Sequence, residues 1–584
     1  MFTGGGECGT SWAVRATETP LLGDTMLTLL ALLACKDGTT PADDSAAPDD
    51  SAVDSEDSGA DDSGDDTGAP DTRWDPVREA VETALKRGYA SGASIAVWVD
   101  GEIVYAEGFG SAHPEQDVPV KTTTLFNIGS DTKKLAAITL LQQVAAGRLS
   151  LTTPLSEALP QLVLLDDPDA MSKAQLSMLL DHTTSFVDDT RMGTVSDDAE
   201  LAAYAYGNFA NNAYFMAEPG AMWNYANPNF SLTGLAVEVA DGRAWGDVVE
   251  DDVLRPLGLN RTFARVEDVL ADGDYAAGYG IINGLDLDIY DLEQVYSYPY
   301  ELGVQEVATF PDSAWVRPAG GVWSTASDMA SLAGFFLDGD TAVLPDELRE
   351  GMVTGQAPFY PKFDFIQYGH GVMVYDAFSW TDGWHETPLW LHGGNHFAYT
   401  SSWTVLPEAR IAVSVLSNGY ADDFSTAAYT AIEVALDGAL ISNPIDMPEL
   451  AEDPADLDHY VGTYVDEHLV GTIIITRDGD KLTASLPDLS AAGFRVNGTM
   501  NESLAGSYTF KLEGAASELT FVSREGEDDA TWARNRMFVA TRVEDSTARL
   551  APITIDKARV QAMLDAAAQS PAQDARAVVS PFGL

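Results

Sequence analysis

The order of strands and helices between residues 74 and 442 restricts the fold more than any other feature of the sequence. Two alternating runs, 93–99 and 102–106, flank Asp100-Gly101, a dipeptide typical of a two-residue β-hairpin turn. Two further strands are predicted at the other end of the region, at 402–406 and 411–416. Strands from the two ends can pair into one antiparallel sheet with helices packed on it, so we expect an α+β fold.

Helices are predicted where apolar residues recur every three or four positions. One such run starts after Ser130 and is closed by Gly147, which predicts a helix with a single apolar stripe. Ser327 is expected to cap another helix. Residues 270–315 are weakly patterned, and we expect an elaborated loop region over the site. Further helices are predicted at residues 76–87, 228–240 and 424–436.

A second, smaller domain is predicted beyond a proline-punctuated linker at residues 443–456. Residues 457–545 contain short strand-like runs separated by turn signals, which indicates a small all-β barrel or sandwich. A short helix at 555–567 and a tail make up residues 546–584. The strands are predicted at 471–476, 481–486, 508–512, 518–523 and 536–542.

The first 73 residues carry signs of export rather than of a folded core. Within residues 1–35, the apolar run at 26–34 is too short to span a bilayer and fits a secretory signal. It ends at Cys35 in a context that resembles a lipoprotein processing site, so we expect an exported, cell-envelope protein attached to the membrane through a lipid on Cys35. The segment before the run is not basic, which keeps a periplasmic or secreted protein as the alternative. Residues 36–73 hold almost nothing large and apolar, and we expect a disordered acidic linker.

Charge and cysteine content argue against several classes of function. The net charge of −59 argues against a nucleic-acid partner, since phosphates require basic patches, and is explained most simply by solubility. The two cysteines, Cys8 and Cys35, both lie near the N-terminus, so the folded part has no disulfide or thiolate site. Two glycines lie between His392 and His396, which argues against a zinc-binding helix. We expect no metal and no other cofactor.

Ser130 is the candidate nucleophile. Lys133 follows three positions later, and no other serine in the chain has a lysine at this spacing. At the start of a helix both side chains face the same side. A lysine whose pKa is lowered can take the proton of a serine hydroxyl, and the N–H groups of a helix start suit a developing oxyanion. Taken alone, the pair also fits an N-cap serine with an exposed lysine.

Two further motifs carry polar groups that suit the same site. Tyr225 and Asn227 flank one residue, so in an extended segment both point the same way, where a phenol relays protons and an amide holds a lysine or a carbonyl. His392 and Gly394 follow an apolar run; a glycine lets a substrate backbone lie along the strand edge, and a histidine adds a polar or cationic group. Taken alone, these motifs also fit a turn before a helix and a glycine bulge with a surface histidine.

Together and in this order, the three motifs resemble the penicillin-recognising serine hydrolases, most nearly the group of class C β-lactamases, D-alanyl-D-alanine carboxypeptidases and esterases. The resemblance runs from about residue 89 to residue 419. It implies an antiparallel sheet flanked by helices, with an all-helical subdomain. The strands that follow, opening at residues 460–464, resemble the lipocalin-like domain often appended to such hydrolases.

The resemblance implies a role for each motif residue. Ser130 corresponds to the nucleophile, Lys133 to its base and Tyr225 to the tyrosine that passes a proton to the leaving group. The residues that correspond to substrate-binding positions are Asn227, His392, Gly394 and Asn395, the last through a backbone N–H that joins that of Ser130 in an oxyanion hole.

Two departures from the family pattern narrow the expected chemistry. His392 stands where β-lactamases carry a lysine, and a mostly neutral histidine grips a carboxylate less firmly. The family's His-Thr-Ser-Gly stretch appears as residues 182–185 and ends in Ser185 instead of glycine. We expect a serine hydrolase acting through an acyl-enzyme on ester or amide bonds of a small molecule or peptide. The alternatives are a β-lactamase or D-alanyl-D-alanine carboxypeptidase, and a non-catalytic envelope binding protein of the same fold; the oligomeric state stays open.

Overall fold

The part of the chain that the structure describes is a single unit within Pro70–Leu584. The structure is a computed structural model that describes residues 71–87, 90–164, 169–188, 195–281, 304–306, 312–396, 399–419, 424–543 and 553–569. The interpretations of residues 1–35, of lipidation at Cys35 and of nearly all of the 36–73 linker lie outside these residues and stay predictions. Among the described helices, none is long and apolar enough to cross a membrane.

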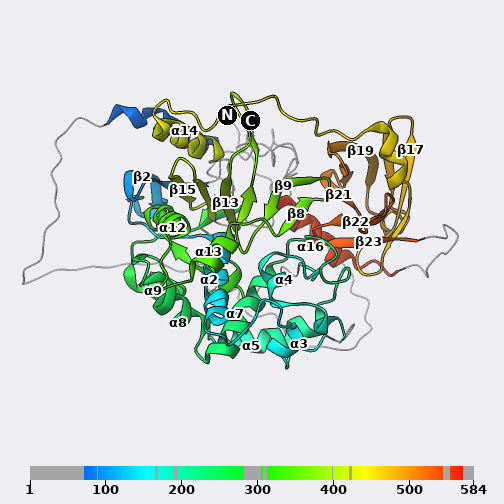
Figure 1. Ribbon diagram of the computed structural model, residues 1–584, viewed down its shortest axis with the longest axis horizontal. Coiled ribbons are helices and arrows are strands. Elements are labelled where there is room, and N and C mark those ends of the chain that lie inside the picture. The colour runs from blue at the N-terminus through cyan, green and yellow to red at the C-terminus, as the bar shows by residue number, and fades with distance from the viewer. Residues whose placement is uncertain are drawn as a thin grey trace, which may run out of the picture. The chain divides into compact units, whose positions relative to one another are not determined.

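A nine-stranded antiparallel sheet runs through the larger domain, which precedes the C-terminal barrel (Figure 1). Its strands, in spatial order, are β3 (Val118–Pro119), β2 (Glu102–His113), β1 (Gly92–Val99), β15 (Ile411–Ser417), β14 (Tyr399–Leu406), β13 (Leu389–His396), β10 (Met373–Tyr375), β9 (Phe363–Tyr368) and β8 (Ala357–Tyr360). The pairing of β1 with β15 confirms that strands from both ends of the region join. Asp100 and Gly101 both have positive φ, 46° and 105°, as a two-residue hairpin turn requires.

Helices cover both faces of this sheet. Helices α1 (Asp75–Arg87) and α14 (Ser425–Leu436) pack on each other and on the central strands, and α12 (Ala326–Asp338) packs on β1 and β15 as well. Every residue of β15 is buried, which requires cover on both faces. The cap of α12 is Thr325, whose hydroxyl accepts from the N–H of Asp328 at 3.1 Å. The prediction of Ser327 as the cap is wrong because the helix already begins at Ala326.

Helix α2 (Thr132–Ala145) lies at the centre of the larger domain. The expected single apolar stripe is wrong, because all ten residues from Thr132 to Leu141 are buried. Among the elements that pack around it are α7 (Asn227–Asp241), α8 (Trp245–Val249), α13 (Asp346–Met352) and the single turn η7 (Arg317–Gly321). A helix enclosed on all sides has no solvent face, so its polar residues must find partners inside the protein.

The helices between α2 and α12 form the all-helical part that the resemblance implies. They are α3 (Leu155–Ala158), α4 (Leu176–Leu180), α5 (Glu200–Tyr204), α6 (Ala210–Asn212), α7, α8 and α9 (Val266–Asp272). Within the expected loop region 270–315, β5 (Tyr279–Ile281) pairs with β6 (Val304–Glu306). The greater part of that region lies outside the described residues.

The C-terminal domain is a closed eight-stranded antiparallel barrel, which confirms the predicted all-β domain. Its strands are β16 (Gly462–Asp466), β17 (Gly471–Asp478), β18 (Lys481–Ser485), β19 (Val496–Leu504), β20 (Ser507–Leu512), β21 (Ala515–Ser523), β22 (Ala530–Asn535) and β23 (Phe538–Val543). The strand predicted from 536 begins at Phe538, so Arg536 lies in the turn between β22 and β23. Helices α15 (Pro487–Ala492) and α16 (Lys557–Gln569) pack on the barrel strands.

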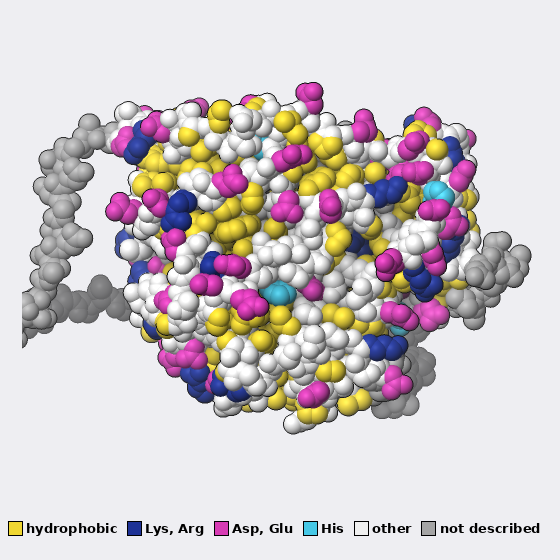
Figure 2. All heavy atoms as spheres, in the orientation of Figure 1, with side chains coloured by type: hydrophobic (Ala, Val, Ile, Leu, Met, Phe, Trp, Pro, Cys, Tyr) yellow, Lys and Arg dark blue, Asp and Glu magenta, His cyan; other side chains and the backbone are white. Residues whose placement is uncertain are grey.

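Acidic side chains are spread over the described surface. On the face drawn in Figure 2, Lys and Arg side chains stand singly or in small groups among Asp and Glu. Among the described residues, several basic side chains are ion-paired, such as Arg261 with Asp272 at 2.8 Å and Arg410 with Asp338 at 2.8 Å. This face therefore presents no continuous basic surface of the kind that nucleic-acid phosphates require.

The residue that replaces the family's glycine is held in a conformation that favours glycine. Ser185 has φ of 64°, a region that costs a residue with a Cβ about 1 kcal/mol. Ser185→Gly should therefore stabilise the protein by about 1 kcal/mol, since among the described residues the Ser185 hydroxyl makes a single long contact, 3.4 Å to the carbonyl of Glu218. Urea unfolding of the two proteins measures the difference. Ser327→Gly, inside helix α12, is the matched control and should lose about 0.5 kcal/mol; equal effects of the two changes would contradict the account of Ser185.

Candidate active site

Ser130 lies on a tight turn directly before α2, not within the helix. The turn is the 3₁₀ helix η3 (Gly129–Asp131), and Gly129 takes φ of 49°. A Cβ on Gly129 would meet the backbone of Gly394 and Asn395 at 3.1 Å. The absence of that Cβ lets strand β13 run against the turn, so the third sequence motif lies beside Ser130.

Lys133 is fully buried and faces Ser130. Its Nζ lies 2.9 Å from Ser130 Oγ, 2.9 Å from Asn227 Oδ1 and 2.7 Å from the carbonyl oxygen of Ala319. The two latter oxygens can only accept, so they take the two N–H bonds of a neutral amine and leave its lone pair for the serine hydroxyl. Burial holds the pKa of Lys133 well below its usual value, which favours this neutral form.

Tyr225 completes a hydrogen-bonded line through the serine. Its hydroxyl donates to Ser130 Oγ at 2.9 Å, and Lys133 Nζ lies 4.9 Å from the centre of its ring. Burial raises the pKa of Tyr225 above its usual value, so the phenol keeps its proton near neutral pH. The serine oxygen thus accepts from one side while its own proton faces the amine of Lys133.

Asn227 is the first residue of α7, and its amide is held from both sides. Its Oδ1 faces Lys133, while its backbone N–H and its Nδ2 donate to Asp188 Oδ1 at 2.8 and 3.3 Å. Asp188 is buried and carries no motif signal, so residue patterns did not predict its part in the site. The Ala319 carbonyl was not predicted either, because a backbone acceptor leaves no trace in the residue types.

Gly394 is required by the closeness of β13 to the serine turn. A Cβ there would lie 2.0 Å from the Ile128 carbonyl oxygen and 2.5 Å from Ser401 Oγ. Asn395, the next residue, lies beside Gly129, so the strand brings its backbone next to the serine turn. The third motif thus lies against the serine turn, with His392 and Gly394 buried and with Gly393 and Asn395 exposed.

His392 is buried, and both of its ring nitrogens are hydrogen-bonded to uncharged groups. Its Nε2 lies 2.8 Å from the hydroxyl of Tyr368, and its Nδ1 donates to the carbonyl of Gly393 at 2.7 Å. Burial first, and then the nearby Lys134 and Lys133, hold the pKa of His392 well below its usual value. A desolvated ring beside two amines stays neutral, so His392 supplies a polar group and not a cationic one.

A buried ion pair fixes the first turn of α2 from below. Lys134 and Asp131 are both inaccessible to solvent and pair with each other, and Lys134 Nζ lies 4.3 Å from the centre of the Trp403 ring. Ser401 Oγ donates to Asp131 Oδ2 at 2.5 Å and lies 2.8 Å from the Ile128 carbonyl. These contacts tie the serine turn to strand β14.

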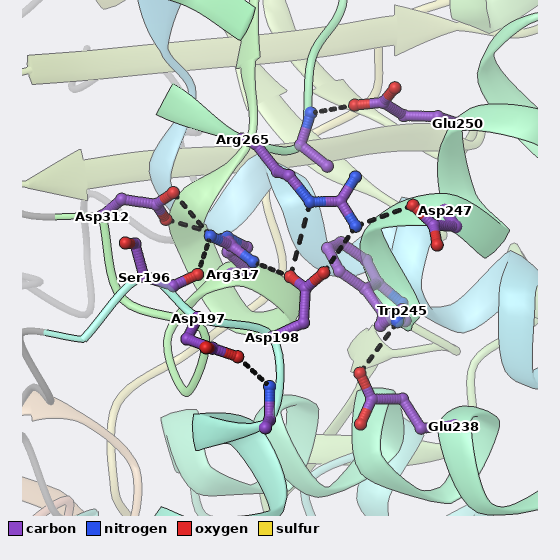
Figure 3. A network of polar contacts seen from close by, with 12 residues as sticks. Ser196, Asp197, Asp198, Glu238, Trp245, Asp247, Glu250, Arg265, Asp312 and Arg317 are labelled. Carbon is purple, nitrogen blue, oxygen red and sulfur yellow. Dashed lines mark hydrogen bonds and ion pairs between the residues drawn. The ribbon is translucent and has the colours of Figure 1, made fainter. Parts of the chain in front are cut away.

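The turn that presents the Ala319 carbonyl is braced by a second polar network (Figure 3). Arg317 is buried and donates to both oxygens of Asp312, at 2.8 and 2.6 Å, and to Asp198. Asp198 in turn accepts from Arg265 at 2.8 Å, so it lies between two guanidinium groups. This network holds η7 against α2 and keeps the carbonyl aimed at Lys133.

Comparisons with known proteins identify the family of the larger domain and relatives of its fold. The sequence model of the family described as Beta-lactamase matches residues 77–436. Penicillin-binding protein 4 of Amycolatopsis lactamdurans is 27% identical over 401 residues, covering 66% of this chain and 96% of that protein. Among solved structures, the octameric penicillin-binding protein homologue from Pyrococcus abyssi matches with a TM-score of 0.52 at 21% identity, over 80% of this chain and 99% of that one. The D-amino acid amidase from Ochrobactrum anthropi SV3 matches with a TM-score of 0.50 at 22% identity, over 63% of this chain and 100% of that one.

Proposed function

Because the chain belongs to the β-lactamase family of serine hydrolases, we propose that it cleaves ester or amide bonds through an acyl-enzyme on Ser130. One observation carries the proposal: Ser130 Oγ lies 2.9 Å from both Lys133 Nζ and Tyr225 Oη. A weak nucleophile thereby has a neutral amine on one side and a phenol donor on the other.

In the acylation step, Lys133 takes the Ser130 proton as Oγ attacks the substrate carbonyl carbon. The negative charge that develops on the carbonyl oxygen is held by the backbone N–H groups of Ser130 and Asn395. Tyr225 then donates its proton to the departing oxygen or nitrogen and regains one from the ammonium of Lys133. The C–O or C–N bond breaks, and the acyl group stays on Ser130.

In the deacylation step, a water molecule attacks the acyl carbon. The same two groups take its proton and return one to Ser130 Oγ, and the acid product leaves. Asn227 holds the lysine amine in line during both steps through the 2.9 Å contact with its Oδ1. The chain supplies every proton donor and acceptor that this sequence of steps uses.

The environment of His392 supports a preference for neutral acyl groups over anionic ones. With its ring neutral and bonded to Tyr368, His392 provides no positive charge for a substrate carboxylate. Esters and the amides of short peptides or D-amino acids fit this requirement, and the amidase named above acts on a substrate of this kind. A screen with short-chain esters, D-amino-acid amides, dipeptides and a coloured cephalosporin separates these classes. Hydrolysis of the cephalosporin alone would replace the proposal by β-lactamase activity.

The neutrality of His392 predicts a flat pH response in substrate choice. We expect the ratio of kcat/KM for a neutral ester to that for its sulfonate-bearing analogue to stay constant between pH 5.5 and 7.5. A histidine with an ordinary pKa of about 6.5 would change its charge in this range and shift the ratio up to about tenfold. His392→Gln, which carries no charge at any pH, is the control and should give the same flat profile. A ratio that falls toward acid pH in the wild type only would show that His392 protonates and faces the substrate.

A further inference from the structure

A residue of the C-terminal barrel contacts the active-site residues directly. Arg536, in the turn between β22 and β23, donates from Nε to Asp188 Oδ2 at 2.8 Å, and its Nη2 lies 2.6 Å from the same oxygen. Its guanidinium carbon lies 4.7 Å from the centre of the Tyr225 ring. Asp188 is completely buried, while the Arg536 side chain is 39% exposed. The barrel thus supplies the positive partner of a buried carboxylate in the other domain.

The turn that carries Arg536 is firmly seated on the segment that leads to Tyr225. The carbonyl of Arg536 accepts from Asn224 Nδ2 at 3.1 Å. Arg534 donates to the carbonyls of Trp223 and Phe359, at 2.5 and 2.8 Å, and lies over the Trp223 ring. These contacts fix the position of the Arg536 backbone and so place its guanidinium within reach of Asp188.

Asp188 determines which way the Asn227 amide points. An ionised carboxylate only accepts hydrogen bonds, so the amide edge that faces it must be the Nδ2 edge. The carbonyl edge of Asn227 then faces Lys133, where it accepts an N–H of the amine. Without a charged and fixed Asp188, the Asn227 amide could flip and present its N–H groups to Lys133. The lone pair of the Lys133 amine would then lose its alignment with the Ser130 hydroxyl.

Asp188 and Arg536 have opposite effects on the pKa of Lys133. Asp188 raises the pKa of Lys133, whereas Arg536 lowers it, against a background of strong lowering by burial. Among the described residues, the other charged or titratable groups near Lys133 are Asp131, Tyr225, His182 and His392. Of these, the two histidines are kept neutral by burial, and Asp131 is paired with Lys134. Arg536 is therefore the cation that offsets the charge of Asp188.

We propose, resting on the hydrolase function above, that Arg536 is a positioning residue by which the barrel domain completes the active site: it holds Asp188, which holds Asn227, which aligns Lys133 on Ser130. The barrel is then a working part of the hydrolase and not an independent appendage. Loss of the Arg536 charge leaves a buried carboxylate without its counter-ion next to the general base. The consequence is a Lys133 that holds its proton to higher pH and a less ordered Asn227.

The test follows the rate constant for fluorophosphonate labelling of the full-length protein between pH 5.5 and 9.5. For Arg536→Gln we expect the midpoint of the profile to move by about one pH unit toward alkaline pH, so that the rate falls about tenfold at pH values on the acid side of both midpoints. Arg536→Lys keeps the charge and should restore most of the wild-type profile. Asp188→Asn removes the negative charge and should move the midpoint the opposite way, toward acid pH, with a lower maximum rate. Lys511→Gln, an exposed charge loss on β20, is the control and should leave the profile unchanged.

A second measurement keeps the inference testable without catalysis. The pH dependence of the difference in free energy of unfolding between a protein and its Lys133→Met derivative reports the titration of Lys133. In the Arg536→Gln background this dependence should begin about one pH unit higher than in the wild type. Identical dependences, or labelling profiles of Arg536→Gln and Arg536→Lys that are both unshifted, would reduce Arg536 to a docking contact. Absence of any labelling of the wild type would overturn the proposed function. The unfolding measurement would then still test whether Arg536 acts on Lys133 through Asp188 and Asn227.

Discussion

Replacing Ser130 by alanine should lower kcat/KM for a short-chain ester by a factor of about 10⁴ or more, because no other group can form the acyl-enzyme. The change removes one oxygen from a turn whose shape is set by Gly129 and by the packing of β13. Lys133 keeps two of its three contacts, with Asn227 and Ala319. The variant should therefore fold normally, and its circular dichroism and melting temperature should match those of the wild type.

The comparison separates catalysis from folding. A folded Ser130→Ala protein that keeps rates within about tenfold of the wild type would remove Ser130 from the mechanism. Ser401→Ala is a useful second control, since Ser401 lies on β14 behind the turn and bonds Asp131 rather than substrate. The Ser401→Ala protein should be less stable than the wild type but should still carry out the chemical step.

Replacing Lys133 by methionine should cost a factor of about 10³ in kcat/KM, the range of an efficient general base. Methionine fills the same buried space but offers no lone pair to the serine proton. In the wild type, the rate should rise with pH as Lys133 loses its proton, and it should do so well below the usual lysine pKa, because burial lowers the pKa of this amine. The variant should show no such rise. A wild-type rate that climbs only near pH 10 would contradict the neutral amine.

The Lys133→Met substitution also tests the lowered pKa of Lys133 through the pH dependence of the free energy of unfolding. Between the lowered pKa of Lys133 in the folded protein and about 10.4 in the unfolded chain, the unfolded chain binds one more proton. Stability from this group therefore increases with pH, by about 1.4 kcal/mol per pH unit, and the increase ends near the unfolded pKa. The free energy of unfolding of the wild type, relative to Lys133→Met, should rise as the pH is raised from 7 to 9. Urea unfolding at four pH values measures it, and a constant difference would contradict the lowered pKa.

Local signals in the sequence predicted much of the fold. Asp100-Gly101 marks its hairpin because only a few residue types adopt the two positive φ angles of that turn. Helix α2 was placed correctly, but its enclosure was not, since burial on all sides depends on elements far away in the chain. Strand β19 was missed because its residues alternate between partly buried and exposed with few large apolar side chains.

The site divides in the same way between local and distant contacts. The Ser130–Lys133 spacing is a helix-scale feature, so the sequence predicts their meeting, and Tyr225 and Asn227 followed from the resemblance. Arg536 and Asp188 are 348 positions apart, and no pattern of residue types joins them. The pKa of His392 likewise depends on distant contacts, since it is set by burial and by two lysines from another element, neither of which appears in its own motif.

The most direct test of the account is the intact mass of the protein after reaction with a fluorophosphonate, followed by peptide mapping. We expect one covalent adduct per chain, located on Ser130, and no adduct on Ser130→Ala. We also expect Lys133→Met to react far more slowly than the wild type at pH 7. An adduct on another serine, equal labelling of Ser130→Ala and the wild type, or a wild-type protein that stays unmodified would contradict the assignment of Ser130 as the nucleophile.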